Sequence, residues 1–162
     1  MIVAIDPGDT KSAWCIIDET TCTPLFWNKQ DNQDVLTSLE SRIWRTVNGD
    51  LISVSLNEMA IEMIQSFGMP VGQSVFLTCV WIGRFIEASK LKYTFVYRSE
   101  EKIQICQSMK ANDSTIRQAL IDIYGTPGTK KSPGVLYGMT KDMWSALAVA
   151  VTFLKLKGVW TL

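Results

Sequence analysis

Three acidic residues of this chain lie among apolar neighbours. Asp6 ends the run IVAID, Glu62 interrupts MAIEMI, and Asp142 precedes the run MWSALAVAV. A buried carboxylate is costly unless a cation pairs with it or a metal binds it. Singly, Asp6 could cap a turn, Glu62 could pair with a lysine, and Asp142 could favour a helix N-terminus. Together, the three fit one geometry, in which two strands and one helix start present acids at a common sheet edge.

An acidic cluster of this kind suits hard divalent cations. Mg²⁺ prefers oxygen ligands and retains waters that a phosphate can displace. Two such ions ~4 Å apart can activate a water and stabilise the leaving oxygen of a phosphodiester. The chain has no histidine, which removes Ser-His-Asp and Cys-His nucleophiles and histidine-ligated zinc. We therefore expect two Mg²⁺ ions per active site, with Mn²⁺ able to substitute.

The elements that must position these acids follow from the apolar spacing. Short apolar runs between turn residues predict strands at 2–6, 12–18, 23–29, 59–64 and 93–98. Helical spacing predicts helices at 34–47, 73–89, 99–107, 113–124 and 141–157. Pro7 and Gly8 stop the first strand, so that Asp6 lies at its open rim.

The order of these elements predicts an α/β fold. Three antiparallel strands, then a helix, then parallel strands alternating with helices indicate a mixed sheet with helices on both faces. The 162 residues are expected to form a single domain, 1–162. Glycine and proline predict loops at 66–72 and 125–138.

Composition excludes several classes of protein. Hydrophobic residues make up 47% and charged residues 20%, which is typical of a globular chain rather than a disordered one. No apolar run approaches the ~20 residues that span a membrane, and we expect no signal peptide. The four cysteines form no CxxC pair and are expected to be reduced thiols of a cytoplasmic protein: Cys15, Cys22, Cys79 and Cys106. No GxxxxGKS loop is present.

Three motifs carry a family resemblance. AIDPG, then AIEMI with a glycine-containing loop, then KDMWSALAVA resemble the motifs of the RuvC Holliday-junction resolvases, especially shorter phage-type members. The segment VYRSEEK resembles the family's strand-to-helix segment with a DNA-facing lysine, here Lys102. The resemblance covers nearly the whole chain, with the motifs in the same order.

The resemblance implies an RNase H-like fold, a homodimer and Mg²⁺-dependent, paired symmetrical nicking of four-way DNA junctions. It implies catalytic and metal-binding roles for Asp6, Glu62 and Asp142. It also implies a cytoplasmic location, that of the bacterial host if the chain is phage-encoded. The stretch IDPGDTKSAW also resembles the first phosphate loop of actin- and sugar-kinase-like ATPases, but those proteins need two such domains.

The sequence departs from the family pattern near Asp142. The family often has a fourth acid one turn later, where this chain has Ser145, on the same helix face. Three alternatives stay open for the fourth metal ligand: Ser145 acting through a water, Asp9, or none.

A second departure concerns DNA contacts. The family commonly has a basic residue eleven positions after the equivalent of Lys102, where this chain has Asp113. Lys110 or Arg117 could take its place.

Further candidates for DNA contacts lie in the two predicted loops. Phe67 and Met69 could wedge between bases or close over the core. Lys130 and Lys131 could contact phosphates or belong to a solvated loop.

The helix predicted over 73–89 is apolar on many sides, which suits a central helix or one that meets a second subunit. On this helix, Trp81 and Phe85 could belong to the core or to a dimer interface.

The leading interpretation is a metal-dependent Holliday-junction resolvase. One alternative is a nuclease of the same fold that cuts other branched DNA or RNA–DNA hybrids. Another is a junction-binding protein with impaired catalysis, which Ser145 would favour.

Overall fold

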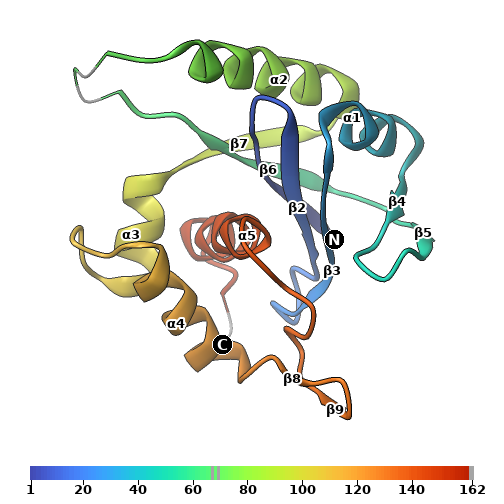
Figure 1. The fold of residues 1–162 in the computed structure, drawn as a ribbon, viewed down its shortest axis with the longest axis vertical. Helices are drawn as coiled ribbons and strands as arrows, with labels where there is room; N and C mark the ends of the chain where they lie inside the picture. The colour runs from blue at the N-terminus through green and yellow to red at the C-terminus, as the bar shows by residue number, and fades with distance from the viewer. Residues whose placement is uncertain (67, 69, 161–162) are drawn as a thin grey trace.

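A five-stranded sheet forms the centre of the computed structural model, which describes residues 1–66, 68 and 70–160 (Figure 1). Its strands, in spatial order, are β3 (Pro24–Asp31), β2 (Lys11–Ile17), β1 (Ile2–Asp6), β6 (Glu58–Met63) and β7 (Lys92–Tyr97). The first three are antiparallel, whereas β1, β6 and β7 run parallel. This topology confirms the predicted mixed sheet.

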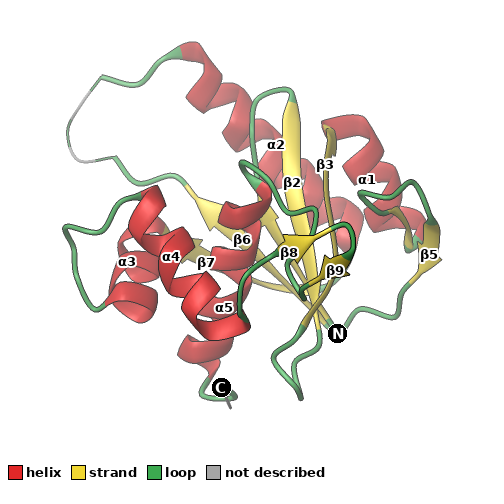
Figure 2. Cartoon of the chain, turned by 60° about the horizontal axis from the view of Figure 1, so that its bottom comes forward, coloured by secondary structure: helices red, strands yellow, loops and turns green. Residues whose placement is uncertain are grey.

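Helices cover both faces of the sheet, as predicted. One face carries α1 (Asn32–Ser41) and α2 (Gln73–Ser89), and the other carries α3 (Arg98–Cys106), α4 (Asp113–Tyr124) and α5 (Met143–Lys157) (Figures 1 and 2). Side chains alternate between two cores, because successive residues of a strand point to opposite faces. In β1, Val3 and Ile5 pack on the α1–α2 side, whereas Ile2 and Ala4 pack on the α5 side.

The central helix is α5. Every side chain from Ala146 to Leu154 is buried, because the helix contacts β1 and β2 on one side and α3 and α4 on the other. This environment explains why its sequence is apolar all round. By contrast, α2 leaves apolar side chains exposed, so the interpretation of 73–89 as the central helix is wrong: Phe76, Leu77 and Val80.

The helix predicted over 34–47 is too long. It ends at Ser41, because Arg42 adopts a left-handed conformation (φ 63°) and its N–H donates to the Ser38 carbonyl. The chain then forms a hairpin of β4 (Ile43–Arg45) and β5 (Leu51–Ser53). Trp44 is buried in this hairpin, with its ring centre 4.7 Å from that of Trp14. Tertiary packing, rather than helical spacing, therefore explains the apolar residues after 41.

The other boundaries differ by a few residues. The helix predicted over 99–107 begins at Arg98, with Tyr97 as its N-cap. The last helix begins at Met143, so Asp142 immediately precedes it. The predicted loop 125–138 contains a small hairpin of β8 (Gly128–Thr129) and β9 (Ser132–Pro133). Gly128 has a φ of +74°, and a Cβ there would lie 2.3 Å from the Ser132 carbonyl oxygen, so the turn requires glycine.

The cysteines remain thiols throughout the described ranges, with Cys15 and Cys22 buried and Cys79 and Cys106 half-buried. Within the same ranges, no helix has the length and apolar character needed to cross a membrane.

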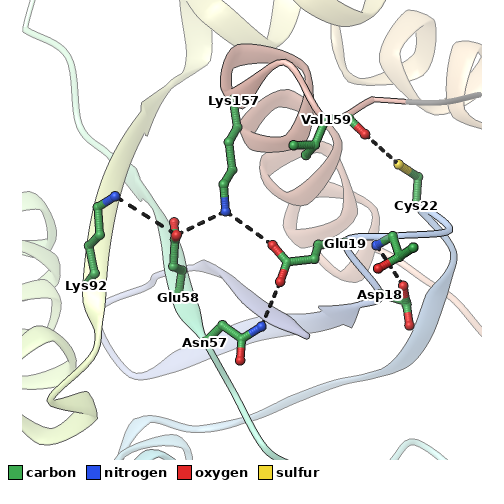
Figure 3. A network of polar contacts seen from close by, with 9 residues as sticks. Asp18, Glu19, Cys22, Asn57, Glu58, Lys92, Lys157 and Val159 are labelled. Atoms are coloured by element: carbon green, nitrogen blue, oxygen red, sulfur yellow. Dashed lines mark hydrogen bonds and ion pairs between the residues drawn. The ribbon is translucent and has the colours of Figure 1, made fainter.

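An ion-pair network ties the C-terminal end of α5 to the sheet (Figure 3). The Lys157 ammonium lies 3.2 Å from a Glu19 oxygen and 3.0 Å from a Glu58 oxygen. Asn57 donates a 2.7 Å hydrogen bond to Glu19, and Lys92 lies 4.0 Å from Glu58. Glu58 begins β6, so this network lies at the opposite end of the strand from Glu62.

Candidate active site

The sheet register brings Asp6 and Glu62 together. In the parallel ladder of β1 and β6, Ile5 pairs with Ile61, and the two acids follow as the next residues. Both are half-buried and lie on the α5 side, since Ala4 and Ala60, two residues earlier in each strand, pack in that core. The carboxyl ends of parallel strands thus present two predicted site residues side by side.

The two carboxyls interact directly. Burial raises the pKa of Asp6 well above its ordinary range, and the charge of Glu62 and a hydrogen bond with Glu62 raise it further. The charges of Asp142 and Glu101 add smaller increases to the pKa of Asp6. Burial also raises the pKa of Glu62, although the hydrogen bond with Asp6 and the charge of Arg98 oppose this. Burial therefore disfavours the charged form of both carboxyls, and a divalent cation beside them would offset this.

Asp142 lies close enough to this pair to raise the pKa of Asp6 but makes a separate contact. Its carboxylate forms an ion pair with the ammonium of Lys29 on β3. In the part of the chain that the structure describes, no three potential ligand side chains lie close enough together to hold a metal ion. The donor chemistry of Asp6 and Glu62 fits a hard divalent cation, whereas Asp142 is engaged by a lysine.

A fourth acid lies near this site, and the sequence pattern did not predict it there. The side chain of Glu101 on α3 is fully buried, and burial together with the charge of Glu62 raises its pKa to about 8. Arg98 forms ion pairs with both Glu101 and Asp113. One oxygen of Glu101, Oε1, has no hydrogen-bond partner among the described residues.

Glu100 and Glu101 both lie in the first turn of α3, where a negative charge is favourable. In the structure it is Glu100 that caps α3, accepting a 2.8 Å hydrogen bond from the N–H of Tyr97. The burial of Glu101 could have been predicted from its spacing. It lies four residues before the buried Ile105 and therefore on the face of the helix that meets the core.

The structure separates the two candidates for the fourth ligand. Ser145 lies in the first turn of α5 and lines the same pocket as Asp142. Asp9 accepts a 3.0 Å hydrogen bond from the Thr10 hydroxyl and is not among the charges that shift the pKa of Asp6. The charge of Glu101, by contrast, raises the pKa of Asp6, and the charge of Glu62 raises the pKa of Glu101.

A pocket of about 310 Å³ adjoins Asp142 between the starts of α4 and α5. Three basic side chains line it, Arg98, Arg117 and Lys141, together with the hydroxyls of Ser114 and Ser145. The Arg117 guanidinium lies over the Trp144 ring, 4.9 Å from its centre. Cationic and hydroxyl donors beside acidic residues are suited to hold a phosphate next to a metal site.

The predicted DNA-contacting residues occupy different parts of the α3–α5 side. Arg117 lines the pocket, and Lys102 is half-buried on α3. Exposed lysines lie further out: Lys110 between α3 and α4, and Lys130 and Lys131 at the tip of the β8–β9 hairpin. The predicted wedge residues, Phe67 and Met69, lie outside the described residues.

The predicted interface residues on α2 have different environments. Phe85 is fully buried within the chain, so of the two alternatives for this residue the structure favours the core. Trp81 is half-buried, with its ring centre 5.7 Å from that of Phe85 and the Arg84 guanidinium 4.0 Å from its own centre.

Comparison with solved structures identifies the fold. The chain is similar to Thermus thermophilus RuvC in complex with a Holliday junction substrate, with a TM-score of 0.65, 14% identity, and coverage of 97% of this chain and 94% of that chain. A second Thermus thermophilus RuvC structure matches with a TM-score of 0.63, 14% identity and coverage of 98% and 96%. No protein-family model and no curated protein sequence matches the chain. These similarities confirm the expectation from the three motifs that this chain has the RuvC-like, RNase H-like fold.

Proposed function

We propose that this chain is a divalent-metal-dependent endonuclease that resolves four-way DNA junctions by paired symmetrical nicks. The observation that carries the proposal is the facing pair of Asp6 and Glu62 at the carboxyl ends of two parallel strands of a RuvC-like fold. The similar Thermus thermophilus RuvC was solved with a Holliday junction substrate, which supports junction DNA as the substrate. Residues 1–162 would act as one nuclease domain.

Asp6 and Glu62 would hold the metal from the sheet, and Asp142 from the start of α5. Mg²⁺ or Mn²⁺ there, as two ions per site, would supply water activation and stabilisation of the leaving oxygen. The chain's own task is to present both carboxyls of Asp6 and Glu62 in their charged forms. The charge of Arg98 favours the charged form of Glu62, because it lowers the pKa of that carboxyl.

The pocket that Asp142 lines would orient the phosphodiester through its basic side chains. Arg117 is held by Trp144 on one side, so its guanidinium is pre-positioned to donate two hydrogen bonds to a phosphate. Lys141 and Ser145 line the same pocket from the start of α5. The exposed Lys110, Lys130 and Lys131 would contact phosphates further along the arms, which positions the junction without reading its sequence.

A homodimer is part of this proposal, because two symmetrical nicks need two active sites related by a two-fold axis. The exposed apolar side chains of α2 support it: Phe76 is 61%, Leu77 45% and Val80 59% exposed. Neighbouring apolar residues on one helix are typical of a contact surface. Sedimentation at micromolar concentration should therefore give a dimer, and a Val80→Glu/Phe76→Ser variant should give a monomer.

A nicking assay tests the function. Four-way junction, replication fork, RNA–DNA hybrid and plain duplex are compared with and without Mg²⁺, using wild type and Asp6→Asn. Paired nicks in the junction that need both Mg²⁺ and Asp6 support a resolvase. Preference for the fork or the hybrid would instead indicate a nuclease of the same fold with another substrate.

A junction-binding protein without catalysis is the second candidate. Two observations favour it: Ser145 stands where the family often has an acid, and the described residues contain no preformed three-ligand group. Tight, structure-selective binding of the junction with no nick at any Mg²⁺ or Mn²⁺ concentration would establish this alternative.

A further inference from the structure

The position of Lys29 is set by the register of the sheet. Asp6 of β1 pairs with Ala13 of β2, and Ala13 pairs with Lys29 of β3. Residues directly opposite one another in adjacent strands point to the same face, so Lys29 and Asp6 share the α5 face. Two strand spacings separate their backbones, about 10 Å, and the side chain between them is only the methyl group of Ala13.

The long side chain of Lys29 extends from this row to the start of α5. Its ammonium forms an ion pair with Asp142, with the two side chains 33% and 45% exposed. Within the described part of the chain, Asp142 is the only carboxylate that Lys29 contacts. Asp142 is also the metal ligand that the proposed site requires from the start of α5.

We propose that Lys29 is an internal cation that competes with the divalent metal for Asp142 and thereby sets the metal concentration that the site requires. This inference rests on the proposed function, since it takes Asp142 as a metal ligand. An ammonium and a divalent ion cannot lie against the same carboxylate without strong repulsion. Metal binding therefore displaces the Lys29 ammonium into the solvent that already reaches it.

The pair is suited to exchange. A half-exposed lysine–aspartate pair contributes little to stability, and the flexible lysine stem can turn outward. The pair also neutralises Asp142 in the metal-free protein, next to the buried carboxyls of Asp6 and Glu62. In the metal-free protein, Lys29 thus supplies the positive charge beside Asp142 that the metal would supply when bound.

The test measures Mn²⁺ binding by the full chain without DNA, from the electron paramagnetic resonance signal of free Mn²⁺. Lys29→Met should bind Mn²⁺ about fivefold more tightly than wild type. Lys29→Arg, which keeps the charge, should bind as wild type does, and Lys29→Gln should resemble Lys29→Met. The matched control is Lys11→Met, because Lys11 also pairs with an aspartate on this sheet, Asp31, at 3.4 Å. It should leave Mn²⁺ binding unchanged.

A double variant locates the competition. In an Asp142→Asn background, Lys29→Met should give no further gain in Mn²⁺ affinity, and a gain that persists there would overturn the inference. The inference alone fails if Asp6→Asn weakens Mn²⁺ binding but Lys29→Met and Lys29→Gln bind no more tightly than Lys11→Met. If Asp6→Asn leaves Mn²⁺ binding unchanged, the metal centre of the proposed function fails, and the Lys29 inference fails with it.

Discussion

The acidic residues at the two ends of the central sheet have opposite environments. At one end, Glu19 and Glu58 both meet Lys157, and hydrogen bonds from Asn57 and Lys157 lower the pKa of Glu19 (Figure 3). At the other end, Asp6 and Glu62 meet each other, and the pKa of each is raised.

The same strands and the same helix connect these two ends, so the difference is local. Paired charges at the first end clamp α5 to the sheet. At the second end, burial and the nearby charges of other acids disfavour the charged forms of Asp6 and Glu62, which opposes folding in the absence of a ligand. Groups with strongly perturbed pKa values in one place are typical of functional sites. In the proposed function, the first end would contribute stability and the second would contribute chemistry.

The largest effect should come from removing a carboxylate at the functional end. Asp6→Asn, Glu62→Gln and Asp142→Asn should each lower junction cleavage by at least about a hundredfold, because each removes a proposed metal ligand. Junction binding, measured by gel shift without metal, should persist because the basic residues are unchanged. Glu58→Gln, at the clamped end, is the matched control and should cleave as wild type does. A variant of the three that keeps cleavage within about tenfold of wild type is not a metal ligand.

Removing Lys157 from the ion-pair network should have the converse effect, a loss of stability without a loss of cleavage. Lys157→Met removes two ion pairs and should lower the free energy of unfolding by about 1–2 kcal/mol, without changing cleavage by the folded protein. Urea denaturation and the nicking assay measure the two quantities. Lys11→Met removes a more exposed pair and should cost less. Equal stability of Lys157→Met and wild type would show that the network clamps nothing.

The pH dependence of stability should distinguish the two ends as well. The folded-state pKa of Glu101 is about 8, above the ordinary value of 4.5. Between these values the folded state holds a proton that the unfolded state has released, so the contribution is present at low pH and lost as pH rises towards 8. In chelator-treated protein, stability should thus fall less steeply over this range in Glu101→Gln than in wild type. Parallel curves for the two proteins would contradict the raised pKa.

The pKa of Glu19 is lowered, so Glu19 changes the pH dependence of stability in the opposite direction to Glu101. Its contribution is present above the ordinary pKa of glutamate and is lost as pH falls below it. Glu19→Gln should therefore remove part of the acid-induced loss of stability and leave the loss towards pH 8 unchanged.

The smallest effect should come from the hairpin that lies away from the acids. The Lys130→Ala/Lys131→Ala variant should weaken junction binding at every sequence and reduce the slope of log affinity against log salt by about one unit for each lost contact. Fluorescence anisotropy over a range of salt concentrations measures this slope. If the slope is unchanged, the β8–β9 hairpin does not contact DNA.

Local pattern is sufficient to predict the sheet and three acids of the candidate site. A strand and its termination are encoded within a few residues, so IVAID followed by Pro7 is enough to place Asp6 at a strand end. The same holds for the succession of the five sheet strands along the chain and for the apolar run that forms α5. These features depend on alternation, helical spacing and chain breakers, all of which are read over short distances.

Contacts between distant segments are decided only in three dimensions. The hairpin after Ser41 forms because Trp44 packs on Trp14, which no helical spacing reveals. Lys29 meets Asp142 across 113 positions of sequence because the strand register places Lys29 in the row of Asp6. Glu101 lies near enough to Glu62 to have its pKa raised by that charge, because α3 packs against α5. Charge pairing depends on distance and burial, and both arise from packing between elements rather than from the pattern within one.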